Sequence, residues 1–320
     1  MKTAVIFPEN GNLELIDLPI PTPKENEILV SMKCVAMKHL DKAIARGTHY
    51  SSENNVNKAK IIGSDGVGIL ENGNRVYVVN PKGTLSEKIA VEKNFTVPIP
   101  DGLEDSIASA LPNAVMGSAM GMKYRAKMQS GETVLINGAT GFTGKVAVQI
   151  AKIYGAKKII VTGRNEIETK KLLKLGADDH ILTTNENFIE KLKAIHQDSP
   201  IDIVIDYLWG KSAENILEAI KGNGSFSHRT RFVSIGSITG DSVQLSSQIL
   251  RGTDLQISGS GLGSWTKQEV HILLTEILPE MFELAVNKKL NIETETFDID
   301  NIGNIWNQKM DTNKRLIVKI

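Results

Sequence analysis

The sequence contains one cysteine, Cys34, among its 320 residues, and it has no long apolar run. A single cysteine excludes an intrachain disulfide framework. No apolar segment approaches the length of a membrane-spanning helix, and the first residues, MKTAVIFPENGN, hold too short an apolar run for a signal peptide. We therefore expect a cytoplasmic protein.

The net charge is zero, because the 37 Lys and Arg residues are balanced by 37 Asp and Glu residues. A neutral chain has no general attraction to nucleic acid or to a membrane surface, so neither is expected as a partner. The composition is otherwise ordinary for a globular protein, with 41% hydrophobic and 23% charged residues. We find no internal repeat and no low-complexity tract, and the length fits one or two domains.

What is present follows two patterns along the chain. The first hundred residues contain short strand-like runs separated by Gly, Asn, Pro and Asp, which favours a small β-rich unit. An Ala- and Met-rich segment from residue 105, helical apart from Pro112, is expected to bridge two domains. From Gly131, six continuous apolar strands alternate with helices, which predicts a doubly wound parallel α/β sheet of the Rossmann type. The strand-like tail RLIVKI is expected to return to the first domain.

The most informative stretch is the glycine loop between the strand TVLING and the helix that follows it. It is not a strict G-x-G-x-x-G motif, because alanine replaces its first glycine. Its middle glycine lets the backbone approach a pyrophosphate, its last glycine lets the helix pack on the sheet, and the helix N-terminus offers amide hydrogens to an anion. The predicted cofactor-binding residues here are Ala139, Thr140, Gly141, Phe142, Thr143 and Gly144.

The second strand of this unit ends in Gly163, Arg164 and Asn165, which are also predicted to bind the cofactor. An NAD site would place Asp or Glu near this point to hold the ribose hydroxyls, but no acidic residue comes before Glu166. A guanidinium can bind a 2′-phosphate in bidentate fashion. The sequence therefore predicts NADPH rather than NADH, the alternative being that Arg164 is a solvated surface residue.

A competing motif, Y-x-x-x-K, runs from Tyr207 to Lys211 and resembles the Tyr–Lys pair of the short-chain dehydrogenases. The context differs, since more than a hundred residues precede the nucleotide-binding strand here and Tyr207 ends an apolar strand. At such a strand end, Tyr207 and Leu208 are predicted to line the cofactor crevice.

Taken together, the chain resembles the medium-chain dehydrogenase/reductase superfamily. GNRVYVV is similar to its G-D-R-V strand, and GTLSEKIAVEKNFTVPIPDGL, ASALPNAVMGSAM, AVQIAKIYGA and LLKLGADDHI are similar to its usual segments. The resemblance implies a Rossmann dinucleotide-binding domain over residues 119–261. It also implies a β-rich GroES-like catalytic domain, which is formed by residues 1–118 with 262–320.

Members of this superfamily differ in whether they bind zinc, and its alcohol dehydrogenases bind catalytic Zn²⁺ through Cys and His. Here Lys38 stands in the position of the ligand cysteine, and the Gly-His-Glu motif has become Gly63-Ser64-Asp65. No metal is therefore expected, and Cys34 is expected to be a small buried hydrophobe. The chain is similar to the zinc-independent quinone oxidoreductase branch, which implies hydride transfer from NADPH to a quinone or α,β-unsaturated carbonyl.

The resemblance also implies further site residues. Tyr50 is a candidate to hydrogen-bond the acceptor oxygen or deliver a proton, with a packing role as the alternative. Lys38 is a candidate to stabilise negative charge or contact cofactor phosphate, unless it points to solvent. Ile235, Gly236 and Ser237 should pass near the nicotinamide, and Gly117 stands where relatives often have Thr.

Two other functions stay open from the sequence. One is an unsaturated acyl-CoA reductase, which needs a basic rim that the sequence does not place. The other is an NADPH-binding regulatory or structural protein without turnover. The last strand of the Rossmann sheet, DLQISGSG, is a candidate for pairing across a two-fold axis, so a homodimer is expected.

Overall fold

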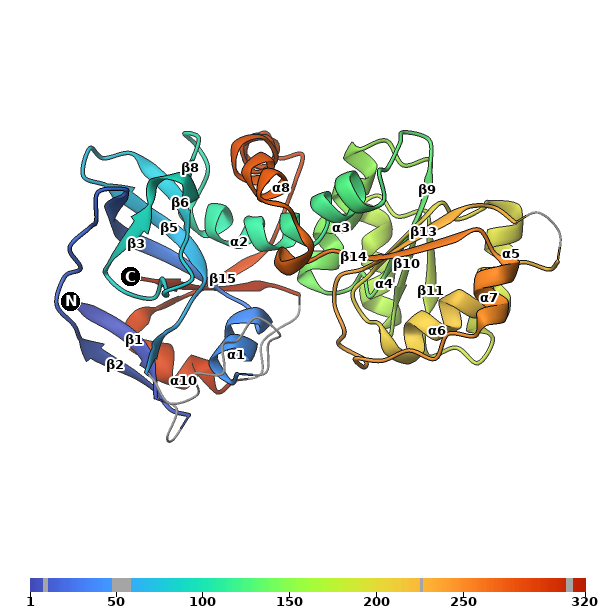
Figure 1. Ribbon diagram of the computed structural model, residues 1–320, viewed down its shortest axis with the longest axis horizontal. Coiled ribbons are helices and arrows are strands. Elements are labelled where there is room, and N and C mark those ends of the chain that lie inside the picture. Colours follow the sequence, from blue (N-terminus) through green and yellow to red (C-terminus); the bar gives the residue numbers. More distant parts are fainter. Residues whose placement is uncertain (8–10, 48–58, 225–226, 309–312) are drawn as a thin grey trace. The chain divides into compact units, whose positions relative to one another are not determined.

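The computed structural model describes residues 1–7, 11–47, 59–224, 227–308 and 313–320. These residues form two compact units, Met1–Pro112 with Gln268–Ile320, and Asn113–Lys267. Figure 1 shows that the first unit contains both ends of the chain, drawn in blue and red. Among the described helices, none has both the length and the apolar character to cross a membrane.

The first unit is built mainly from antiparallel strands. Its strands are β1 (Lys2–Ile6), β2 (Leu13–Asp17), β3 (Glu27–Met37), β4 (Lys60–Ile61), β5 (Asp65–Leu70), β6 (Arg75–Val79), β7 (Lys88–Glu92), β8 (Thr96–Pro98), β15 (Thr294–Asp298) and β16 (Arg315–Lys319). Its helices are α1 (His39–Ala45), α8 (Lys267–Ile272), α9 (Leu278–Val286) and α10 (Ile302–Trp306), and α2 (Asp105–Met116) runs into the second unit.

The long strand β3 organises this unit. A larger sheet has the order β15-β16-β3-β5-β6-β8, with β7 also paired to β3, and a smaller one has the order β2-β1-β4. Fully buried residues such as Val30 and Val35 of β3 and Val318 of β16 pack in one apolar core. The tail therefore returns to the first unit, where β16 pairs antiparallel with β3.

The second unit alternates strand and helix. Its strands are β9 (Thr133–Asn137), β10 (Lys158–Gly163), β11 (Asp179–Leu182), β12 (Ile203–Asp206), β13 (Thr230–Ser234) and β14 (Leu255–Gly259). Its helices are α3 (Phe142–Ile153), α4 (Glu166–Leu175), α5 (Phe188–Asp198), α6 (Gly210–Ala219) and α7 (Ser247–Gly252).

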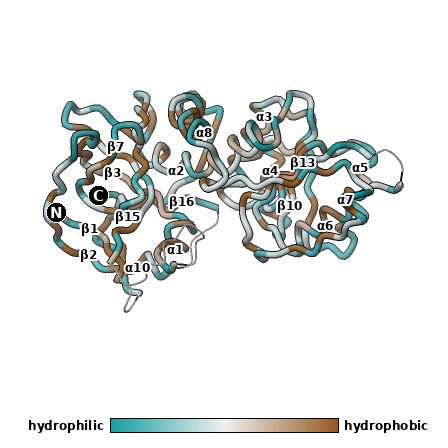
Figure 2. Tube along the Cα trace, viewed as in Figure 1, coloured by the Kyte–Doolittle hydropathy of each residue, from teal (hydrophilic) through white to brown (hydrophobic). Residues whose placement is uncertain are grey.

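These strands form a parallel sheet in the order β11-β10-β9-β12-β13-β14, which is the doubly wound Rossmann order. The direction of the winding reverses beside β9, so the helices cover both faces. One face carries α5 and α6, where Leu192 and Ile216 pack with Leu135 and Val204 of the sheet. Figure 2 shows how hydrophobic and hydrophilic stretches alternate along the trace of each unit. The mixed α/β fold expected from the sequence is thus confirmed.

The bridging segment departs from its prediction as one helix interrupted at Pro112. Helix α2 contains Pro112 and ends at Met116, and a separate π-helical turn covers Gly121–Arg125. Gly117 and Gly121 allow close packing here, because a Cβ at either position would lie 3.1–3.2 Å from a side chain of the second unit. The segment approaches its neighbours more closely than a regular helix of larger residues could.

Candidate dinucleotide site

The glycine loop joins the carboxyl end of β9 to the start of α3, whose N-cap is Gly141. Gly138 has φ +83°, a left-handed conformation that favours glycine. The amides of Gly138 and Ala139 donate to Oγ1 and O of Thr162 on β10, at 3.1 and 2.9 Å. A Cβ at Gly144 would lie 2.5 Å from Cα of Ala139, so only glycine lets α3 pack this close to the loop.

The space in front of α3 suits an anion. A Cβ built on Gly141 meets no atom within 4 Å, so the loop leaves open space at the helix N-terminus. Helix α3 has twelve residues, and the amide hydrogens of its first turn are directed toward this end. The residues therefore fit the diphosphate of a dinucleotide, with the predicted residues 139–144 forming the cradle.

The predicted strand-end residues lie against this loop. A Cβ on Gly138 would come 2.8 Å from Cγ of Leu208, so the Leu208 side chain covers the first glycine. A Cβ on Gly236 would lie 2.7 Å from the carbonyl oxygen of Tyr207, which brings the β13 loop beside the β12 loop. The structure thus gathers residues from three separate loops at the carboxyl edge of one sheet.

Tyr207 and Gly117 are directly connected. The phenol of Tyr207 donates to the carbonyl oxygen of Gly117 at 2.6 Å, and burial raises the pKa of Tyr207. A Cβ on Gly117 would lie 3.1 Å from Thr143 Cγ2 and 3.6 Å from Ile235 Cγ2. The Thr143 methyl therefore fills the space that a larger residue at Gly117 would need, and these predicted cofactor residues form one cluster. Ser237, the last of the predicted loop residues, accepts a hydrogen bond from Gly240 through its carbonyl oxygen.

The end of β10 has a mixed charge. Arg164 is exposed, and Asn165 caps α4 by accepting a hydrogen bond from the Glu168 amide at 3.2 Å. A Cβ on Gly163 would lie 2.6 Å from Thr140 Cγ2, so Gly163 allows the glycine loop to approach β10. The carboxylate of Glu168 pairs with Lys145 and Lys171, at 3.7 and 2.7 Å.

Reasoning from the sequence missed a set of buried polar residues beneath the loop. Asn137, Thr162 and Asp206 are fully buried at the ends of three neighbouring strands, and Asn137 is hydrogen-bonded to both of the others. Their only sequence signal is that each lies within two residues of the carboxyl end of a strand.

Lys38 lies in a buried ion pair of the first unit, with its side chain 1% exposed. Its ammonium donates to Asp65 Oδ1 at 2.5 Å and to the Ala36 carbonyl at 2.8 Å, and it lies 3.2 Å from Asp41 Oδ2. Burial alone would lower the pKa of Lys38, but Asp41 and Asp65 raise it above its ordinary value. All three ammonium hydrogens are directed to protein acceptors, so a role on the acceptor would require this pairing to break.

Zinc does not fit this place. Ser64 donates to the free oxygen of Asp41 at 3.0 Å, and Tyr77 donates to Asp65 Oδ2 at 2.8 Å. The Lys38 ammonium already supplies the positive charge that the two carboxylates require, and it would repel a metal ion. Across the described ranges, no three His, Cys, Asp or Glu side chains are grouped so that they could hold a metal.

Two other sequence expectations, for Tyr50 and Cys34, concern the first unit. Tyr50 lies outside the described residues. Cys34 is buried on β3 as expected, whereas His39 is exposed at the start of α1. In the segment Gly259–Ser264, Ser264 caps a short turn by accepting a hydrogen bond from the Gly261 amide at 3.1 Å.

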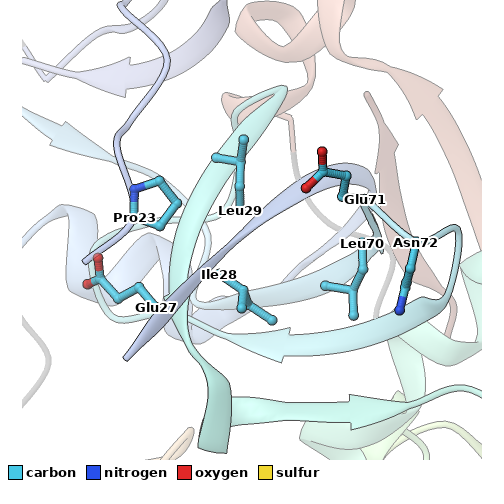
Figure 3. Close-up of a pocket in the computed structure, with 7 residues that line it drawn as sticks. All are labelled: Pro23, Glu27, Ile28, Leu29, Leu70, Glu71 and Asn72. Atoms are coloured by element: carbon cyan, nitrogen blue, oxygen red, sulfur yellow. The ribbon is translucent and has the colours of Figure 1, made fainter. Parts of the chain in front are cut away.

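A pocket lies in the first unit, beside the start of β3 and the β5–β6 turn (Figure 3). Its lining includes Ile28, Leu70 and the carboxylates Glu27 and Glu71. Glu27 already pairs with Lys82 at 3.0 Å. None of the predicted site residues lines this pocket, so it is separate from the candidate dinucleotide site.

Comparison with known proteins places the chain among oxidoreductases. Residues 143–278 match the family described as zinc-binding dehydrogenase. The quinone oxidoreductase of Rattus norvegicus is 27% identical over 283 residues, which cover 84% of this chain and 82% of the rat protein. The Sus scrofa quinone oxidoreductase is 27% identical over 261 residues, covering 79% of this chain and 77% of the pig protein.

Solved structures share the whole fold. The quinone oxidoreductase of Thermus thermophilus, solved also in complex with NADPH, has a TM-score of 0.79 and 24% identity, with 100% of both chains covered. The Pseudomonas syringae pv. Tomato quinone oxidoreductase has a TM-score of 0.80 and 20% identity, covering 100% of this chain and 99% of the other. At this identity the likeness establishes the architecture of the two units.

Proposed function

The chain is a quinone oxidoreductase-like member of the medium-chain dehydrogenase/reductase superfamily, and from that premise we propose that it transfers hydride from NADPH to a quinone or α,β-unsaturated carbonyl. The open cradle at Gly141 carries the proposal, because it presents the α3 amides to an anion. The mammalian relatives support the reaction class, and the complex of the Thermus protein supports the nicotinamide cofactor.

In this proposal each loop binds a different part of the cofactor. Residues 139–144 bind the diphosphate through backbone amides, and Arg164 binds the adenosine 2′-phosphate. Tyr207, Leu208 and Ile235–Ser237 line the nicotinamide end and exclude water from it. NADPH, when bound, supplies the hydride, so the chain's own residues mainly position the two reactants.

Zinc independence is proposed from the Lys38 ion pair. A conjugated acceptor delocalises the incoming charge into its own oxygen, so it needs less activation than an isolated carbonyl. The Lys38 ammonium is paired with Asp41 and Asp65, so these two carboxylates already hold a cation of the chain and are not available to a metal. Tyr50 stays a candidate for delivering the proton.

Turnover is tested by mixing the protein with NADPH and a panel of quinones, enones and enoyl-CoAs, and following the absorbance of the reduced nicotinamide. Oxidation with quinones or enones is the expected result. Turnover restricted to enoyl-CoAs would favour an acyl-CoA reductase. Tight NADPH binding with no turnover on any compound would favour a regulatory or structural role.

Cofactor preference is tested with Arg164→Ala. We expect the wild type to bind NADPH more tightly than NADH, and the variant to lose at least about tenfold in NADPH affinity with little change for NADH. Dissociation constants from nicotinamide fluorescence measure both. Lys174→Ala, an exposed cation at the far end of α4, is the matched control. Equal affinity of the wild type for the two cofactors would reject the 2′-phosphate assignment.

A further inference from the structure

A buried carboxylate, Asp206, lies at the carboxyl end of β12 and has no place in the contacts proposed above. Asp206 Oδ1 accepts hydrogen bonds from Asn137 Nδ2 at 2.7 Å and from the Leu208 amide at 3.0 Å. Asp206 Oδ2 accepts from the Trp209 amide at 3.1 Å. Burial raises the pKa of Asp206, and these three donors act in the opposite direction. A buried carboxylate that accepts several hydrogen bonds holds its donors in place, here the Asn137 side chain and the backbone of the turn after β12.

The donor Trp209 has an unusual backbone. Its φ of +56° and ψ of −154° lie in a region that is nearly confined to glycine and is strained for any other residue. Gly210 follows with φ +52°. The turn persists because its surroundings hold it. The Trp209 carbonyl accepts from Thr239 Oγ1 at 2.8 Å, and the indole packs edge-on against Phe232 with ring centroids 6.0 Å apart.

The same carboxylate is linked to the glycine loop. Asn137 Oδ1 accepts hydrogen bonds from Thr162 Oγ1 at 2.6 Å and from Ser212 Oγ at 3.0 Å. Thr162 Oγ1 in turn accepts from the Gly138 amide at 3.1 Å. A continuous chain of hydrogen bonds therefore runs from the first glycine of the loop to the strained turn after β12.

We propose that Asp206 is a positioning residue, which fixes the glycine loop and the Tyr207–Gly210 turn relative to each other and holds Trp209 in its strained conformation for that purpose. The turn so held presses Leu208 onto Gly138, which sets the width of the cradle at its nicotinamide side. The ligand is the dinucleotide, so this role rests on the proposed function.

The role is tested by a double-mutant cycle of Asp206→Asn and Trp209→Gly, with the NADPH dissociation constant as the readout. Asparagine keeps one acceptor oxygen but puts an NH2 group, which can only donate, where Oδ2 accepts from the Trp209 amide, so Asp206→Asn should weaken binding by at least about tenfold. Glycine adopts the strained conformation without help. In the Trp209→Gly background, the same Asp206→Asn change should therefore cost less than about threefold.

The matched control is Asp202→Asn at the opposite end of the same strand region. Asp202 accepts from the Thr133 amide at 2.7 Å and pairs with His228. Neither partner belongs to the chain of hydrogen bonds that reaches the glycine loop. This variant can lower the unfolding midpoint in urea, but its NADPH affinity should match the wild type. An equal loss of affinity from Asp206→Asn in both backgrounds would overturn the role assigned to Trp209.

Amide hydrogen exchange separates this inference from the proposed function, because it needs no cofactor. Asp206→Asn should speed exchange at the Leu208 and Trp209 amides by at least about tenfold, with unchanged exchange in β11. Unchanged exchange and unchanged NADPH affinity would together overturn the inference. A wild type that binds neither NADPH nor NADH would overturn the proposed function instead. Thr239→Val, which removes the hydroxyl held against the turn, carries the same test if Asp206→Asn does not fold.

Discussion

At the scale of single residues, burial decides how reactive Cys34 is. Its side chain is 4% exposed within the sheet of the first unit, and burial raises the pKa of its thiol to about 11. The thiolate is the reactive form, so we predict no reaction of the native protein with a chromogenic disulfide reagent at neutral pH. One equivalent should react in denaturant. Rapid release of a full equivalent from the native protein would contradict this prediction.

The half-buried ring of His196 is expected to make stability depend on pH. Its Nδ1 accepts a hydrogen bond from the Ile201 amide at 3.1 Å, which requires an unprotonated nitrogen. Burial lowers the pKa of His196 below 6.5, and the nearby His228 lowers it further. A folded-state pKa below the unfolded value stabilises the protein above pH 6.5, and that contribution is lost as the pH falls through the folded pKa.

The measurement is urea unfolding of wild type and His196→Asn between about pH 7.5 and about pH 5. The wild type should lose more unfolding free energy over this range than the variant, because asparagine can still accept from Ile201 but takes up no proton. His271→Asn on the exposed side of α8 controls for removing a histidine. Parallel losses in wild type and His196→Asn would rule out this role of the ring.

For single residues, the sequence predicted which positions need glycine better than it predicted which polar side chains pair with each other. The glycines at 141, 144 and 163 were predicted because their spacing reflects a local loop geometry. The partner of Asn137 is 69 residues away, and that of Lys38 is 27 residues away. Such pairs are created by strand order, so the buried network and the Lys38 ion pair could not be predicted before the topology was known.

At the scale of elements, two glycines of one loop should respond differently to the same substitution. A Cβ at Gly144 collides with the Ala139 backbone at 2.5 Å, while a Cβ at Gly141 meets open space. We predict that Gly144→Ala lowers the unfolding free energy by about 1–3 kcal/mol. Gly141→Ala should change stability by less than about 1 kcal/mol, yet weaken NADPH binding because its methyl enters the cradle.

Urea unfolding and NADPH titration of both variants check the pair. A Gly141→Ala variant that binds NADPH like the wild type would place the diphosphate elsewhere. A Gly144→Ala variant of wild-type stability would mean that α3 can move away from the loop.

Strands were predicted more reliably than the bridging segment. Continuous apolar runs define β9 to β14 because parallel strands are buried on both faces. The break after Met116 had no such signal, since Gly117 and Gly121 are tolerated in many helices. Their significance comes from contacts with Thr143 and Ile235, which lie on other elements.

At the scale of the whole molecule, strand β14 is the last strand of the Rossmann sheet and, among the described residues, pairs with a strand on one side only. We propose that two copies pair through β14 across a two-fold axis, which would satisfy the unpaired amides and carbonyls. Light scattering should then give twice the 35.0 kDa chain mass. Gly259→Pro removes an amide on the outer side of β14 and should shift the mass toward the monomer, whereas Gly259→Ala should not. A monomeric wild type would refute the homodimer.

The overall architecture followed from the sequence because its signals are distributed and redundant. The order of strands and helices, the glycine loop and the apolar tail each point to the same α/β fold. The place of Arg164 at the end of β10 could be read from the sequence, and the structure adds that Asn165, the next residue, caps α4.

The sheet around β3 also sets an order for folding during synthesis. Its neighbours β5 and β7 leave the ribosome soon after β3, but β16 comes from residues near position 315. The second unit draws all its strands from one continuous stretch, so a nascent chain can complete that core first. The earlier-made β-rich segment must meanwhile keep the second half of one side of β3, residues 34–37, unpaired, which makes it a part of the newborn chain that needs protection by a chaperone.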